Sequence, residues 1–428
     1  MTSPHAQVHS PEAKAAYDAR WQRVMDCVNL KQPDRLPTAL FCTFWLAKLG
    51  GISHRQLMYD YDKAKELGER ALAELQPDLH NPFLVHVTAG PMLDALDYKQ
   101  LIWPGHGVGD DQPFQYLDRE YMKAEEYDEF IDDPTGFYLR KYLPRVAGAF
   151  DGFEEFPDVP GAHYFRLIGV LRAFGRPKMR AALERIFKAC ETVDHFSQEN
   201  SSQENSAFTK RTAALGFPMS HVTTSVSPYD LVADYFRGAT GTMKDLYRNQ
   251  DKLLELLEKA CRFLTRQTIN WAKGSRHPVV FFPVHWAPDA FMSPKQFETF
   301  WWPSFRKLMV NLIDAGLIPM PLWEADCTKR LEVIRDIPPG KCIYWFERTD
   351  MVRAFEVLGD VVALRGNISP SLLTTGTPEE VDVAVRHLAE EVFHKGGKLI
   401  LDAAFGLPDE TPVENAHAMY AAARKYGS

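Results

Sequence analysis

"VVALRGNISPSLLTTGTPEEVDVAVRHLAEEVFHKGGKLILDAAFG" (residues 361–406) contains two short apolar runs with a helix-like segment between them. The flanking runs, VVALRGN and KLILDAAFG, have the length and the aliphatic content of buried strands. Between them, Thr377 and Glu380 form a capping box at the start of a helix, and the glycines at 396–397 end it. The stretch therefore predicts a strand–helix–strand unit with two parallel strands.

The same unit recurs upstream of this stretch. Apolar runs at 277–286, 318–323 and 341–347 are each followed by a segment with helical spacing. Five such strand–helix units, without a glycine-rich dinucleotide fingerprint, favour a closed (β/α)₈ TIM barrel over a doubly wound sheet. Strands are less distinct in the first half of the chain. We expect them near 36–44, 81–88, 163–169 and 219–226.

We expect residues 1–428 to form a single barrel domain, since no composition shift marks a boundary. Residues 1–35 precede the first expected strand and predict an N-terminal helical extension. The polar, self-repeating stretch SQENSSQENS within 195–210 predicts an exposed loop.

Composition narrows the class of protein. The chain has 45% hydrophobic and 25% charged residues and a net charge of −8, which gives no reason to expect nucleic-acid or anionic-membrane partners. No apolar run approaches the roughly 18 residues that span a bilayer, and the first residues lack signal-peptide features. Six scattered cysteines do not form a disulfide pattern. We therefore expect a cytoplasmic protein with free thiols.

Polar side chains follow the carboxyl ends of the five predicted strands, where a TIM barrel carries its active site. Each alone has a simpler explanation as a helix cap or a buried hydrogen-bonding group, but their accumulation favours a site. The residues are His285, Asp289, Glu324, Cys327, Glu347, Arg365, Asn367 and Asp402.

His285 is the strongest single candidate. An imidazole at a strand end can act as a general acid or base or as a metal ligand, and the alternative is a histidine bonded to a nearby carbonyl. Glu324 ends an apolar strand, so a partly buried carboxylate is expected there, and it needs a cation, a metal or a proton. We assign Asp289 and Asn367 to the same catalytic group.

Cys327 lies in the first turn of the helix that follows, where the helix dipole lowers the pKa of a thiol. Packing explains this cysteine equally well.

Tryptophans gather near the same strand ends. Trp286, Trp323 and Trp345 together predict a flat apolar wall for an aromatic or planar substrate, although large aromatics more often fill cores. His106 lies in a glycine-rich loop that we expect to fold over the barrel mouth as a further substrate contact. This loop lacks the Lys and Ser/Thr of a phosphate-binding loop.

Several of these segments resemble the uroporphyrinogen decarboxylase superfamily. The similarity is carried by HWAPDAFMSPKQFETFWWP, WEADCTKRLEVIRDIPPGK, RGNISPSLLTTGTPEEV and LPDETPVENAHAMYAAARKYG, and by the earlier SPYDLVADYFRGATGTMKDLYRNQDKLLELLEK. It runs from about residue 225 to the end and is faint before it. The resemblance implies a (β/α)₈ fold. It also implies one of two activities, porphyrinogen decarboxylation or methyl transfer to corrinoid proteins by zinc-dependent enzymes.

The chain departs from both of those patterns. The segment FCTFWLAKLGG (41–51) has no arginine where the decarboxylases hold substrate carboxylates. Trp323 and Ala325 occupy the positions of the His-x-Cys zinc pair of coenzyme M methyltransferases, and Phe405 lies near the position of their third ligand. The remaining branch comprises methyltransferases of ether demethylation systems, whose zinc ligands vary.

For that branch the resemblance implies zinc held by His285, Glu324 and Cys327, with Glu347 and Asp402 as substitutes. Zinc or a proton donor such as His285 would polarise the ether oxygen of a small apolar or aromatic methylated substrate. The chain has no Asp-x-His-x-x-Gly corrinoid motif, so the corrinoid is expected on a separate partner protein.

Two alternatives remain open at this point. A metal-free lyase on a smaller carboxylic acid would use Arg365 as its carboxylate anchor. A non-catalytic barrel that binds a planar ligand is the other. The sequence also leaves a homodimer open.

Overall fold

A computed structural model describes residues 10–428, apart from 83, 85–86, 158–163, 201–205, 222 and 276. Its centre is a parallel sheet in which six consecutive strands are hydrogen-bonded in the order β11-β10-β9-β8-β7-β6. The strands are β6 (Thr223–Thr224), β7 (Val279–Val284), β8 (Ile318–Trp323), β9 (Ile343–Phe346), β10 (Ala363–Ile368) and β11 (Leu399–Ala403).

Two short strands from the first half of the chain close the sheet into a barrel. β1 (Ala39–Leu40) and β2 (Leu79–His80) pair in parallel with each other. Parallel bridges join Thr38 to Leu401 on one side and His80 to Met219, in the segment leading to β6, on the other. The ring of β1, β2 and β6–β11 therefore has eight parallel strands, which confirms the (β/α)₈ prediction.

Two of the expected strands are wrong. Of the strand expected at 163–169, residues 164–169 belong to the helix α10 (Tyr164–Phe174), because a short apolar run does not distinguish a strand from a helix by periodicity. The strand expected at 81–88 is instead β2, at residues 79–80. A ninth strand would not fit the closed eight-stranded ring.

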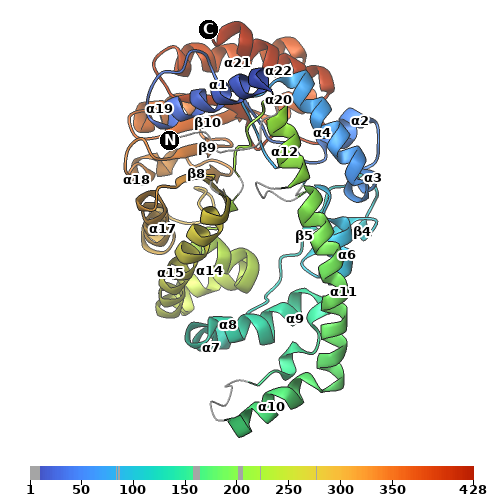
Figure 1. The fold of residues 1–428 in the computed structure, drawn as a ribbon. Helices are drawn as coiled ribbons and strands as arrows, with labels where there is room; N and C mark the ends of the chain where they lie inside the picture. Colours follow the sequence, from blue (N-terminus) through green and yellow to red (C-terminus); the bar gives the residue numbers. More distant parts are fainter. Residues whose placement is uncertain are drawn as a thin grey trace.

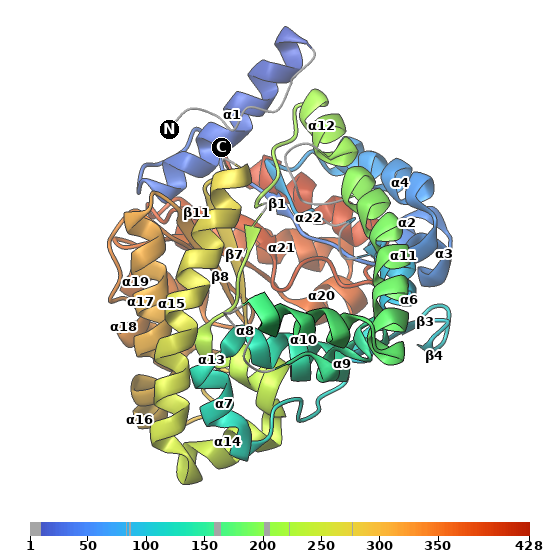
Figure 2. The same ribbon diagram turned by 60° about the horizontal axis from the view of Figure 1, so that its bottom comes forward.

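Helices cover the outside of the barrel, and the largest apolar cluster fills the space between them and the strands. α15 and α17 lie side by side on one flank (Figure 2). The covering helices are α2 (Trp45–Gly50), α3 (His54–Tyr59), α4 (Tyr61–Leu75), α13 (Pro228–Asp230), α14 (Gly238–Arg248), α15 (Gln250–Ser275), α16 (Pro294–Gln296), α17 (Trp302–Asp314), α18 (Leu331–Ile334), α19 (Met351–Leu358), α20 (Pro370–Thr375), α21 (Pro378–Leu388) and α22 (Val413–Tyr426). None of the described helices is long and apolar enough to cross a membrane.

The N-terminal extension is helical, as expected. α1 (Pro11–Val28) begins at Ser10, whose side chain accepts a hydrogen bond from the backbone of Ala13. Its apolar face joins the cluster inside the barrel, and Trp21 meets His277 edge to face at 5.2 Å. α1 therefore closes the end of the barrel opposite the carboxyl ends of the strands. Residues 1–9 lie outside the described part of the chain.

An arm of helices extends from the barrel (Figure 1). It contains α6 (Gly90–Leu96), α7 (Tyr127–Asp132), α8 (Pro134–Phe137), α9 (Leu143–Val146), α10 (Tyr164–Phe174) and the long α11 (Pro177–Asn200), which leads to α12 (Ala207–Ala214). The polar loop predicted at 195–210 is therefore wrong for 195–200 and 207–210, which are helical. Gln and Glu are good helix formers, so a polar repeat does not prevent a helix. Residues 201–205 lie outside the described chain.

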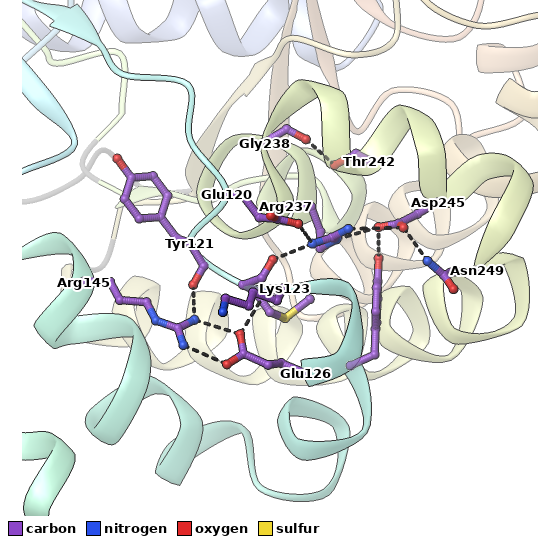
Figure 3. Close-up of polar contacts among 12 residues, drawn as sticks. Glu120, Tyr121, Lys123, Glu126, Arg145, Arg237, Gly238, Thr242, Asp245 and Asn249 are labelled. Atoms are coloured by element: carbon purple, nitrogen blue, oxygen red, sulfur yellow. Dashed lines mark hydrogen bonds and ion pairs between the residues drawn. The ribbon is translucent and has the colours of Figure 1, made fainter.

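A buried ion-pair network attaches the arm to the loop after β6 (Figure 3). Arg237 Nε lies 2.6 Å from Asp245 Oδ2, and both side chains are almost fully buried. Tyr127 donates to the same carboxylate at 2.7 Å, and Arg237 also bonds the carbonyl of Met122 at 2.6 Å. Arg237 ends the turn η5 (Leu231–Arg237), so this network holds in place the segment that carries Asp234.

Candidate active site

Three side chains from neighbouring strand ends meet at the barrel mouth. His285 follows β7, Glu324 follows β8, and Asp234 lies in η5 after β6. The Nδ1 of His285 is 2.6 Å from Asp234 Oδ2, and its Nε2 is 3.3 Å from Glu324 Oε1. Parallel strands bring their carboxyl ends to one edge, which explains why residues far apart in sequence form one chain of contacts. The structure thus brings together His285 and Glu324, two of the residues expected at the site.

Trp286 and Asp230 fix the orientation of Asp234. The indole of Trp286 donates to Asp234 Oδ1 at 2.6 Å, so both oxygens of this carboxylate are engaged. The backbone N–H of Trp286 donates to Asp230 Oδ1 at 3.1 Å, and Ser227 donates to the other oxygen of Asp230 at 2.8 Å. A carboxylate held at both oxygens positions the imidazole ring.

The two carboxylates raise the pKa of His285. Burial alone would lower the pKa of this imidazole, but the hydrogen bonds and negative charges of Asp234 and Glu324 outweigh it and raise the pKa to about 11. Burial raises the pKa of Glu324, while the contact with His285 opposes that increase. At neutral pH the site therefore holds an imidazolium between two carboxyl groups.

Glu324 keeps unused hydrogen-bonding capacity. Apart from the 3.3 Å contact with His285, its buried Oε1 has no hydrogen-bond partner among the described residues. A buried carboxylate oxygen in that state is costly unless a ligand or water satisfies it. This observation points into the barrel mouth as the place where a substrate group binds.

Asp230 is a second buried carboxyl group beside the relay. Burial, followed by the negative charge of Asp234, raises the pKa of Asp230 to about 7. Asp230 and Asp234 are missing from the residues predicted from sequence. Their spacing of four, which places two side chains on one helical face, is the signal that identifies them in SPYDLVADYF.

Of the three residues predicted to bind zinc, His285 and Glu324 meet, but Cys327 does not join them. Cys327 is fully buried, and its Sγ lies 3.6 Å from the carbonyl of Glu324. Burial raises the pKa of this thiol well above its usual range, contrary to the expected lowering by a helix dipole. The dipole is weak here because only a 3-10 turn, η7 (Thr328–Arg330), follows Cys327.

The two substitute ligands have other partners. Glu347 Oε2 accepts a hydrogen bond from the backbone of Ala325 at 2.6 Å, and Asp402 is paired with Arg365 inside the barrel. No group of three His, Cys, Asp or Glu side chains among the described residues is arranged to hold a metal ion. The predicted ligand set therefore does not fit a zinc ion.

Arg365 is a core residue, so its prediction as a substrate contact is wrong. It is 0% exposed, and its Nε and Nη2 lie 2.9 and 2.6 Å from Asp402 Oδ2. The guanidinium stacks 3.8 Å above the ring of Trp345. The side chain does point into the barrel, as an alternating strand predicts, but two residues deeper than the mouth.

The predicted wall of three tryptophans does not form. Trp323 points outward and packs against Trp301 and Tyr344, with ring centroids 5.6 and 5.3 Å away. Trp345 is fully buried inside the barrel. Successive strand residues face opposite sides of a sheet, so Trp323 must point away when Glu324 points in. Only Trp286 reaches the mouth.

Asp289 and Asn367 have structural partners, which corrects their predicted catalytic role. Asp289 Oδ2 accepts from the backbone of Lys329 at 3.1 Å, and its Oδ1 forms an ion pair with the buried Arg330 at 3.3 Å. The amide of Asn367 donates to the carbonyl of Thr349 at 2.8 Å. Both side chains tie neighbouring loops together.

His106 contacts the arm side of the molecule. It stacks on Trp103 at 4.7 Å between ring centroids and lies 3.1 Å from Asp94. Neither partner belongs to the relay at the barrel mouth.

Comparison with known proteins agrees with this architecture. The family model described as Uroporphyrinogen decarboxylase (URO-D) matches residues 186–426, more than half of the chain. A solved methyltransferase from Methanosarcina mazei is 14% identical, with 95% of this chain and 98% of that chain covered and a TM-score of 0.58. At that identity the similarity shows the fold alone. No curated protein matches the sequence significantly.

Proposed function

The chain belongs to the uroporphyrinogen decarboxylase family, and we propose that it is a methyltransferase acting on the methoxy group of an aromatic compound. The methyl group would pass to a corrinoid carried by a separate protein. The observation that carries the proposal is the Asp234–His285–Glu324 relay, which holds an imidazolium at the barrel mouth.

Cleavage of a methoxy group needs a proton at the leaving oxygen. When a nucleophile takes the methyl carbon, the carbon–oxygen bond breaks and its electron pair stays on oxygen as a phenolate. A phenol has a pKa of about 10, close to the value of about 11 to which His285 is raised. A positioned acid that donates to the leaving oxygen stabilises the charge that develops there, so Nε2 of His285 is the proposed donor.

The residues around His285 have supporting roles. Asp234 holds Nδ1 and keeps Nε2 directed at the mouth. Glu324 forms an ion pair with Nε2 in the free enzyme, so a substrate oxygen replaces this contact when it binds. After the transfer, His285 recovers a proton from solvent, since its side chain is 39% exposed.

The corrinoid supplies a cobalt nucleophile for the methyl carbon when its carrier protein docks. The chain itself contributes the proton donor and the site that orients the ether. The open barrel mouth is the proposed meeting place of the two proteins.

Decarboxylation is the less supported activity. Its carboxylate anchor, Arg365, is buried and paired with Asp402, and residues 41–51 contain no arginine. A carboxylate substrate would therefore lack an arginine anchor, the side chain that binds a carboxylate through two parallel hydrogen bonds.

The test combines the purified protein with a methoxyphenol and free cob(I)alamin under anaerobic conditions. We expect methylcobalamin and the demethylated phenol to appear in equal amounts. Release of carbon dioxide from aromatic acids without cobalamin, together with no phenol formation, would overturn the proposal.

A further inference from the structure

Helix α10, at the far end of the arm, exposes an apolar face. Leu167, Ile168 and Leu171 are 52%, 47% and 70% exposed. Positions three and four apart are neighbours on a helix surface, so these side chains form one continuous stripe. A helix at the surface of a globular protein normally turns such a stripe toward the core. Here it is turned to the outside, at the part of the arm remote from the strands (Figure 1).

The stripe extends into a patch that is large for a surface. An aromatic side chain offers about 150–250 Å² and an aliphatic one less, so at exposures of 36–70% the α10 side chains together present on the order of 500 Å². The largest patch on a typical monomer is about 300–600 Å² and is often functional. The members are Tyr164, Phe165, Leu167, Ile168, Leu171 and Phe174.

Basic residues follow this patch along the chain. Residues 164–188 contain seven Lys and Arg and a single acidic residue, Glu184, whereas the whole chain carries a net charge of −8. Along the end of α10 and the first half of α11 the exposed cations are Arg172, Arg176, Lys178, Arg180, Arg185 and Lys188. Lys178 pairs with Glu154, and Arg176 and Arg185 donate to the backbone carbonyls of Glu155 and Asp151. The expectation that no anionic surface would be a partner came from the average charge, which conceals this local excess.

The charge of the patch distinguishes between its two candidate partners, a second copy of the chain and an anionic lipid bilayer. A second copy of the chain joined through the same face would bring two cationic regions together, because an isologous contact pairs each patch with itself. Like charges placed opposite each other oppose association. A partner with a negatively charged surface and an apolar interior complements both the basic residues and the apolar stripe. An anionic lipid bilayer has this chemistry.

We propose that α10 and the first turns of α11 dock the protein on an anionic membrane surface. The apolar stripe enters the boundary between headgroups and acyl chains, and the arginines and lysines contact lipid phosphates. The acidic remainder of the chain is repelled by the same surface, which orients the arm toward the lipid and the barrel mouth away from the direct contact. This attachment lies on the membrane and is reversible, and it does not depend on the proposed methyl transfer.

The test is co-sedimentation of the full chain with two kinds of vesicle. One is phosphatidylcholine alone, and the other contains about 30% phosphatidylglycerol, which supplies the negative surface potential. We expect binding to the anionic vesicles at low salt, release at high salt, and little binding to phosphatidylcholine. A protein that stays in the supernatant with both kinds of vesicle would overturn the proposal.

Variants separate the two components of the contact. Leu171→Glu should weaken binding at least about tenfold, because a charge replaces an apolar group that enters the bilayer on binding. Arg180→Ala should weaken it about fivefold, the effect of one cation near an anionic surface. The matched control is Leu254→Glu on α15, at a position that is 39% exposed and lies outside the patch, and it should bind like the wild type.

Sedimentation velocity without lipid tests the other occupant. We expect Leu171→Glu to leave the oligomeric state unchanged. If the wild type is a dimer that Leu171→Glu converts into a monomer, a second copy covers α10 and the membrane proposal is wrong.

Discussion

Asp234→Asn should lower the pKa of His285, because it removes the nearer of the two negative charges that stabilise the imidazolium. Two opposite charges about 4 Å apart interact by about 4 kcal/mol at an effective dielectric constant near 20, which corresponds to a change in pKa of about 3. The imidazole is 39% exposed, so solvent screening reduces the effect. We expect a decrease of about 2 from the wild-type value near 11.

The assay is an NMR titration of the histidine ring protons in both proteins. The chain has 14 histidines, so His285→Gln identifies the resonance that belongs to His285. The sign of the linkage adds a second readout. A raised pKa stabilises the folded state below the unfolded value near 6.5, and this stabilisation disappears as the pH rises through about 11. A wild-type pKa near 6.5, or an unchanged pKa in Asp234→Asn, would refute the reasoning.

Three further predictions concern the buried groups. The pKa of Asp230 is raised to about 7, so the ionisation of Asp230 lowers the stability of the folded protein as the pH rises from about 4 to about 7. The stability of Asp230→Asn relative to the wild type, measured by thermal unfolding, should therefore be greater at pH 8 than at pH 5. An equal difference at the two pH values would contradict this. Arg365→Ala should cost about 3–5 kcal/mol in the free energy of unfolding, because it strands the buried Asp402; normal stability with a raised KM would instead make Arg365 a substrate contact. Cys327 should resist iodoacetamide in the folded protein while the exposed Cys190 reacts, as mass spectrometry can show; equal reaction at both would contradict its burial.

The barrel could be predicted because several independent features of the second half of the sequence indicate the same fold. The apolar runs, the capping box at Thr377 and the glycines at 396–397 all agree with alternating strands and helices. The first half lacks that agreement. β1 and β2 contain two residues each, and α10 is apolar enough to resemble a strand. Short elements depend on tertiary contacts that a local pattern does not contain.

The site could be predicted only in part, for a related reason. His285 and Glu324 lie directly after long strands, so their meeting at one edge follows from topology. Asp234 comes from a helical turn after a two-residue strand, and nothing local indicates that it reaches across to His285. Trp323 shows a different error. It lies at a strand end, as predicted, but its side chain points out of the barrel and not into the mouth. A shift of one residue along a strand moves a side chain from the inner face of the barrel to the surrounding core.

Leaving-group dependence in His285→Gln is the most direct test of the proposed proton transfer. The measurement compares methyl transfer from a methoxybenzene with an unactivated leaving group and from a nitro-substituted one, with cob(I)alamin as acceptor. The variant should lose about 10²–10⁴-fold in rate with the unactivated ether, the usual contribution of a general acid. It should lose far less with the nitro compound, whose phenolate leaves without a proton. An equal loss with both substrates, or no loss with either, would contradict the role of His285 as the acid.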